Sequence, residues 1–264
     1  MDIRDLLPDD FSRDLLSGSL RVAKDMENPV RMHLSAAGLR ELFGHLLDTL
    51  APDDEVRKCK WFEQAKDTPT VTRRQRATYA TQGGFSNEFI ASLGVDVAEL
   101  HKEAVDAITK LNKATHVRPH TLQQDPEAID AFIAEALGAL RGLLVSFSEC
   151  RGLVQNALEK SVYDSMVNAL VTENFDTISS LSGRGYEVDL WIDDDDVEIV
   201  SINAEYVRVR FSGTAPVTMH YGPKNDAAEI SHDFPFWLIF EAKVETPTNL
   251  KLVDHFFDDS GWFE

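Results

Sequence analysis

The spacing of hydrophobic residues changes once along the chain, near residue 182. Before this point apolar residues recur three and four positions apart, as they do on the buried face of an α-helix. After it they alternate with polar residues, as in a strand that has one face in the core. The sequence therefore predicts an α+β protein, with an N-terminal helical bundle followed by a C-terminal antiparallel β-sheet domain. We expect a loosely attached arm at residues 1–28, a helical domain at 29–182 and a β domain with an acidic tail at 186–264.

Helix and strand boundaries follow from caps, prolines and glycines. Helices are predicted at Val30–Leu50, Arg73–Gln82, Asn87–Leu93, from Asp96 onward, from Asp125-Pro126 to Leu144, and at about Cys150–Leu170. Strands are predicted at Tyr186–Ile192, Val207–Phe211, Val217–Tyr221 and Phe236–Val244. We expect Asp193–Asp196 to form a turn and Gly222–Asp233 to form a long loop.

The stretch Val95–His120 gathers more groups able to bind phosphate or move a proton than any other segment. Its apolar residues have helical spacing and should face the core, and Asp96 is placed to cap the helix. The end of the stretch is polar. This contrast predicts a core helix that presents functional groups at its C-terminal end.

Charge is unevenly distributed along the chain, whose net charge is −19. Residues 57–120 contain 11 Lys and Arg against 7 Asp and Glu, whereas residues 186–264 contain 5 against 17. The overall charge argues against a surface that coats nucleic acid uniformly, since phosphates would be repelled. The basic region is the exception. A requirement for solubility is the favoured explanation of the acidity elsewhere.

Several classes of protein are disfavoured by what the sequence lacks. No run of 18 apolar residues occurs and the N-terminus is acidic, so we expect neither a membrane span nor a signal peptide. Cys59 and Cys150 fit no metal-binding spacing and are best interpreted as reduced thiols of a cytoplasmic protein. The sequence contains no phosphate-binding loop, dinucleotide fingerprint, hydrolase elbow or zinc-protease motif.

Three segments resemble the prokaryotic family of predicted pPIWI-associating nucleases. They read TRRQRATYATQGGFSNEFI, LGVDVAELHKEAVDAITKLNKATHVRP and MHYGPKNDAAEISHDFPF, and the similarity spans residues 28–244. The resemblance implies a role beside Argonaute-like proteins in systems that act against phages and plasmids. It implies a nuclease or the nucleic-acid-facing part of one. The alternative is a non-catalytic subunit whose acidic β half binds a partner or mimics the charge of DNA.

The favoured candidate is a metal-independent ribonuclease site of the HEPN type. Such helical bundles place an Arg and a His about six residues apart near a helix end, where the His moves a proton and the cation steadies the phosphate. Here Lys110 stands in the Arg position, before Asn112 and His116, and a lysine lacks the planar fork of a guanidinium. The cation could instead come from Arg118 or from the Arg73–Arg76 cluster.

This site needs no cofactor, and RNA is its expected substrate. Nucleic-acid contacts are predicted for Arg73, Arg74, Arg76 and Lys113. Because HEPN-type sites are often shared across a dimer, a second copy of the chain could supply a missing cation. The competing interpretation is that Asn112 and Thr115 merely satisfy the end of the helix while His116 and Lys113 lie in solvent.

A metal-dependent nuclease site of the PD-(D/E)xK type is the alternative. Glu241 and Lys243 are two apart on a predicted strand and so point to the same side, where they could hold Mg²⁺ and orient a water molecule. Asp189 or the Asp193–Asp196 run would provide the second acid. The short motif also fits ordinary charges at the end of a strand.

A helix-turn-helix at Thr72–Ile108 is a further interpretation of the basic region. The residues at the start of its long helix, Val97, Ala98 and Glu99, are poorly suited to reading bases. We therefore favour ordinary packing within the bundle.

Overall fold

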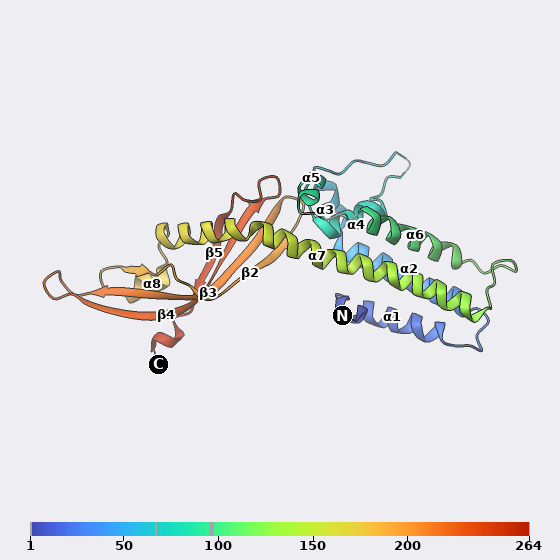
Figure 1. Cartoon of the computed structure of the whole chain (residues 1–264), viewed down its shortest axis with the longest axis horizontal. Coiled ribbons are helices and arrows are strands. Elements are labelled where there is room, and N and C mark those ends of the chain that lie inside the picture. The colour runs from blue at the N-terminus through green and yellow to red at the C-terminus, as the bar shows by residue number, and fades with distance from the viewer. Residues whose placement is uncertain (1, 67, 95–97, 264) are drawn as a thin grey trace. The chain divides into compact units, whose positions relative to one another are not determined.

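The computed structural model describes residues 2–66, 68–94 and 98–263 (Figure 1). The chain divides into two compact units, Met1–Gly152 and Leu153–Glu264, and the boundary falls inside the long helix α7 (Pro126–Thr172). Helices make up the first unit, and the sheet belongs to the second, so the predicted α+β class is confirmed. The predicted domain boundaries at residues 28, 182 and 186 stay predictions. The expected cap Asp96 and the apolar position Val97 lie outside the described residues.

The first unit packs its helices around one apolar core. Its elements are η1 (Ile3–Leu6), α1 (Asp10–Ala23), α2 (Arg31–Leu50), α3 (Asp53–Lys58), α4 (Arg73–Gln82), α5 (Asn87–Ser92), α6 (Ala98–Ala114) and the first part of α7. The core cluster draws on α1, α2, α4, α6 and α7 and includes Leu16, Phe43, Ile108, Leu111 and Leu140, each at most 2% exposed. Burial of these faces is the main stabilising contribution to the bundle.

The N-terminal arm is a packed helix, so the prediction of a loosely attached segment was wrong. Pro8 does not interrupt the helix, because it precedes the N-cap Asp9. The carboxylate of Asp9 accepts hydrogen bonds from the backbone N–H and the hydroxyl of Ser12, both at 2.7 Å. Leu16 is completely buried in the core. The capped start and the short apolar stripe of α1 are therefore sufficient to pack this helix against α2.

Helix α7 is continuous, whereas two helices were predicted over this span. It begins as expected, with Asp125 accepting the Ala128 N–H at 3.3 Å and Pro126 in the first helical position. The polar residues near Ser146 do not end it, because the Ser146 hydroxyl donates to the Leu143 carbonyl at 2.7 Å and is buried. A serine that bonds back to its own helix is compatible with the interior of that helix.

The second unit contains a five-stranded antiparallel sheet. Its elements are the later part of α7, α8 (Asp176–Leu181), β1 (Tyr186–Val188), β2 (Asp193–Ile202), β3 (Tyr206–Tyr221), β4 (Ala228–Lys243), β5 (Lys251–Phe257) and η2 (Ser260–Phe263). Strands β1 and β2 pair with successive parts of one edge of β3, and β3, β4 and β5 follow in order. Buried residues alternate with more exposed ones along β3 and in the second half of β4, as the sequence predicts.

One face of the sheet packs against the helices of its own unit. Figure 1 shows the later part of α7 running along the sheet, where the rings of Tyr163 and Phe211 meet edge to face at 5.3 Å. Phe175 contacts Phe257 at 4.7 Å, and Phe257 stacks on Phe236 at 5.1 Å. These aromatic contacts define the buried side of the sheet.

Two segments of the second unit differ from the sequence prediction. Asp193–Asp196 is the bulged start of β2 rather than a turn, with Asp193 opposite Thr214 and Asp196 opposite Ser212. The predicted loop Gly222–Asp233 is largely the start of β4, which pairs with β3 as far as Tyr221 and Ala228. Both segments are mostly solvent-exposed, so they lack the alternation from which strands are recognised.

Helices α1 and α2 approach each other closely at Gly38. A Cβ atom there would lie 2.1 Å from Ser19 Oγ and 3.3 Å from Ser19 Cβ, whereas one at Gly44 of the same helix would contact nothing. We therefore expect Gly38→Ala to lower the free energy of unfolding by about 1–3 kcal/mol. Gly44→Ala should raise it by up to about 1 kcal/mol through helix propensity. Urea unfolding of both variants measures the difference, and equal effects would contradict the close packing of α1 on α2.

Candidate functional site

Asn112, near the end of α6, contacts a guanidinium group from α4. With its carboxamide oxygen turned toward α4, Asn112 accepts hydrogen bonds from Arg73 Nη1 at 3.0 Å and from Nη2 at 3.2 Å. Arg73 is the first residue of α4, and its backbone is fixed by a capping box between Thr72 and Gln75. Two elements far apart in sequence thus bring a planar cation and a predicted site residue together.

His116 lies in an ordered turn directly after α6. Its backbone N–H bonds to the Lys113 carbonyl at 3.4 Å. The Thr121 hydroxyl donates to the His116 carbonyl at 2.8 Å and accepts the Arg118 N–H at 2.9 Å. The side chains of Lys113, His116 and Arg118 are exposed. His116 follows Asn112 by four positions and lies just beyond Ala114, the last residue of α6.

Lys110 is engaged elsewhere. Its ammonium group pairs with the Glu135 carboxylate of α7, and both side chains are 54% exposed. The hydrogen bond to Glu135 is the main cause that raises the pKa of Lys110. Such an exposed pair is weak, but it directs Lys110 toward α7, whereas Arg73 is the cation in contact with Asn112.

The predicted nucleic-acid-binding arginines fall into two groups. Arg73 and Arg74 are exposed at the start of α4. Arg76 instead bonds to the Ala51 carbonyl at 2.9 Å and pairs with Asp48 and Asp53. Its side chain is only 18% exposed, so it ties α4 to the end of α2 and is a poor candidate for binding phosphate.

A histidine that the sequence analysis did not single out lies buried on α6. His101 is 3% exposed, and its Nε2 lies 2.8 Å from the Thr81 hydroxyl oxygen. That hydroxyl donates to the Ala77 carbonyl at 2.9 Å, so His101 Nε2–H is the donor to Thr81. Burial first, and the charge of Arg74 second, lower the pKa of His101 to about 4. A neutral, buried ring that holds α6 to α4 has a structural role.

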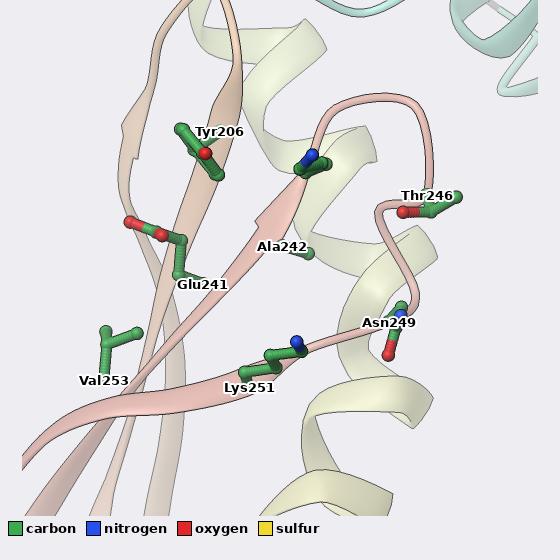
Figure 2. Close-up of a pocket in the computed structure, with 8 residues that line it drawn as sticks. Tyr206, Glu241, Ala242, Thr246, Asn249, Lys251 and Val253 are labelled. Carbon is green, nitrogen blue, oxygen red and sulfur yellow. The ribbon is translucent and has the colours of Figure 1, made fainter.

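A hollow of about 300 Å³ in the second unit gathers two residues of the alternative site. Figure 2 shows Glu241 and Lys251 on neighbouring strands, which pair in register, with Tyr206 and the β4–β5 loop beside them. Lys243 also lines the hollow. The predicted proximity of Glu241 and Lys243 is therefore seen, together with a second lysine that sequence reasoning missed.

The hollow does not fit the predicted magnesium site. Glu241 accepts a hydrogen bond from Arg208 Nε at 2.7 Å on the neighbouring strand. Asp189 bonds to the Pro216 carbonyl, and Pro216 lies eight residues from Arg208 along β3, which corresponds to roughly 26 Å. Asp193–Asp196 pair with the intervening part of β3. No group of three His, Cys, Asp or Glu residues within the described ranges could hold a metal ion. Two lysines beside a neutralised carboxylate suit an anion better than Mg²⁺.

Within the part of the chain that the structure describes, no helix is both long and apolar enough to cross a lipid bilayer.

Comparison with known proteins identifies the family that the sequence resembles. Two family models, both described as predicted pPIWI-associating nuclease, match residues 4–140 and 147–263. Together they cover nearly the whole chain, further than the residues 28–244 on which the resemblance was first based. No curated protein and no solved structure matches it. The six residues between the two matches lie within α7.

The burial of neutral His101 predicts a pH-dependent stability. The folded-state pKa of about 4 lies below the ordinary value of 6.5, so between these values the unfolded chain binds a proton that the folded chain does not. The free energy of unfolding should therefore fall as pH drops from 6.5 to 4, by at most about 1.4 kcal/mol per pH unit from this group. In His101→Leu this contribution should vanish, whereas substitution of the exposed His120 by Gln should preserve it. Chemical unfolding across this pH range measures both slopes, and an unchanged slope in His101→Leu would show that other groups cause the dependence.

Proposed function

The chain belongs to the family of predicted pPIWI-associating nucleases, and on that premise we propose that it cleaves RNA without a metal ion at the end of α6. The site consists of His116, Asn112 and Arg73. One observation carries the proposal: the Arg73 guanidinium donates hydrogen bonds to the Asn112 side chain, four positions before an exposed histidine. Arg73 thereby supplies the planar cation that Lys110 cannot.

The proposed reaction is an attack of the ribose 2′-oxygen on the neighbouring phosphorus. His116 accepts the 2′-hydroxyl proton as the new O–P bond forms, and the bond from phosphorus to the 5′-oxygen breaks. The leaving 5′-oxygen takes a proton from solvent. Arg73 stabilises the charge on the phosphoryl oxygens in the transition state, while Asn112 fixes the plane of the guanidinium. The products are a 2′,3′-cyclic phosphate and a 5′-hydroxyl.

Exposed cations around the site would hold the RNA backbone. Arg74 follows Arg73 in α4, Lys113 lies in the last turn of α6, and Arg118 lies two positions after His116. Each neutralises phosphate charge without reading bases, which suits a cut that depends little on sequence. Lys110 can join them when RNA competes with Glu135 for its ammonium group.

We propose a binding role, without chemistry, for the hollow of the second unit. Lys243 and Lys251 would bind a phosphate there, and Glu241 would remain paired with Arg208. The two lysines are two of the five Lys and Arg residues in the acidic segment 186–264. The Lys243 side chain therefore contributes affinity in this proposal, and its loss should not abolish cleavage.

The family description also indicates the cellular setting that we propose. The protein would act in the cytoplasm of a prokaryote, beside a PIWI-type protein, in defence against invading nucleic acid. A second copy of the chain could bring a further cation to the site. The alternative function is a non-catalytic subunit that docks a basic partner, and the exposed acids Asp193–Asp196 at the start of β2 favour it.

Cleavage assays with and without EDTA test the proposal. Purified protein is incubated with single-stranded RNA and with single- and double-stranded DNA. We expect RNA cleavage that survives EDTA and falls at least about 100-fold in His116→Ala and in Arg73→Gln, because each loses a group that acts in the transition state. The exposed neighbour His120, substituted by Ala, is the matched control and should keep full activity.

Three other outcomes would contradict the proposed site or one of its residues. Cleavage that needs a divalent metal and is lost in Lys243→Ala would move the chemistry to the second unit and overturn the proposed site. No cleavage of any substrate, together with co-purification of a basic partner, would support the non-catalytic alternative. Full activity in Arg73→Gln would remove Arg73 from the mechanism.

A further inference from the structure

Arg31 is a buried cation that lacks a counter-ion within the described residues. It is the first residue of α2 and is 3% exposed. Its Nη1 donates to the Ala23 carbonyl at the end of α1, while Nη2 is buried without a hydrogen-bond partner. A buried guanidinium is unfavourable when its charge is unpaired and one of its donors is unsatisfied.

The start of α2 adds to this positive character. The N-cap residue Val30 offers no side-chain hydrogen bond, and the first turn contains no acidic residue. The positive end of a 20-residue helix dipole is therefore left without an acidic partner, beside a cation. Two features of independent origin thus favour an anion at the same place.

A hollow of about 250 Å³ adjoins these groups. The turn that joins α1 to α2 forms one side, including Glu27 and Asn28, and Arg31 lines the hollow next to it. Gln123 and Gln124, from the segment before α7, line the other side. The Gln123 carboxamide oxygen already accepts the N–H groups of Gln124 and Asp125, both at 3.0 Å, which leaves its amino group as a donor. Glu27 is the one carboxylate that lines the hollow, and it is exposed.

We propose that this hollow binds a phosphate group. A guanidinium forms charge-assisted hydrogen bonds with phosphate oxygens, the Gln123 amino group is a further donor, and the positive end of the α2 dipole favours the negative charge. The volume accommodates one phosphate group with a few water molecules. The site is distinct from the end of α6 and does not depend on the proposed cleavage. Arg31 and Gln123 bind the anion, and Glu27 opposes it.

Calorimetric titration of the full-length protein tests the proposal. Inorganic phosphate and adenosine 5′-monophosphate should bind with one site per chain, and adenosine should not bind. Tighter binding of the nucleotide than of phosphate would identify a nucleotide as the source of the group, and equal affinities would identify the free anion. Binding of adenosine as tight as that of the nucleotide would overturn a phosphate site.

Two substitutions with opposite expected effects sharpen the test. Arg31→Met should weaken phosphate binding at least 10-fold, whereas Glu27→Gln should strengthen it several-fold by removing the opposing charge. Arg40→Met, on the same helix but paired with Glu41, is the matched control and should bind phosphate like the unaltered protein. If Arg31→Met does not fold, the phosphate affinities of Glu27→Gln and Gln123→Ala provide the test. Unchanged affinity in both of these variants would overturn the site. Absence of saturable phosphate binding to the unaltered protein would overturn it outright.

Discussion

Burial of the apolar face of α6 is the constraint on which the site in the first unit depends. Ile108 and Leu111 are at most 2% exposed, and α6 contacts both α2 and α4. The buried His33 of α2 also bonds through Nδ1 to the Ala114 carbonyl, the last of α6. A helix fixed in this way along its apolar stripe presents its opposite face to solvent. The orientation of Asn112 toward Arg73 and the exposure of His116 follow from this packing.

The same constraint separates structural polar groups from available ones. His101 faces inward on α6, bonds to Thr81 and has a lowered pKa, whereas His116 lies beyond the last turn and stays in solvent. Arg76 is held by two carboxylates and a carbonyl, whereas Arg73, three residues earlier, reaches Asn112. Residues of one type in one short segment therefore take different roles according to the groups that they contact.

Sequence periodicity predicted the class of the fold and the central helix, because both depend on which positions are buried. It failed at α1, which was predicted to be a loosely attached arm, and in the middle of α7, where two separate helices were predicted. It also failed at the start of β4, where an exposed hairpin has no alternating pattern. At α1 and at the start of β4, packing or pairing with another segment stabilises an element that has a weak local signal. Strand spacing places Glu241 and Lys243 on one side of β4. Only the strand register shows that Asp189 bonds to Pro216, which is far along β3 from Arg208, the residue opposite Glu241.

The proposed site was predictable only in part for the same reason. Asn112 and His116 are close in sequence, so their shared helix end could be inferred. The partner cation could not, because Arg73 belongs to another helix and its contact depends on how α4 crosses α6. The buried Arg31 is similar. Nothing in its local sequence distinguishes it from an ordinary arginine at the start of a helix, and its unpaired state appears only after packing.

The chemical ends of the RNA products test the central claim most directly. RNA cut in EDTA should carry a 2′,3′-cyclic phosphate on one fragment and a 5′-hydroxyl on the other, because the 2′-oxygen is the proposed nucleophile. A strand with a single ribonucleotide in otherwise 2′-deoxy sequence should be cut only after that nucleotide. Mass spectrometry of the fragments reads both properties. Fragments with 5′-phosphate and 3′-hydroxyl ends, or cleavage after a 2′-deoxynucleotide, would contradict a metal-independent site at His116.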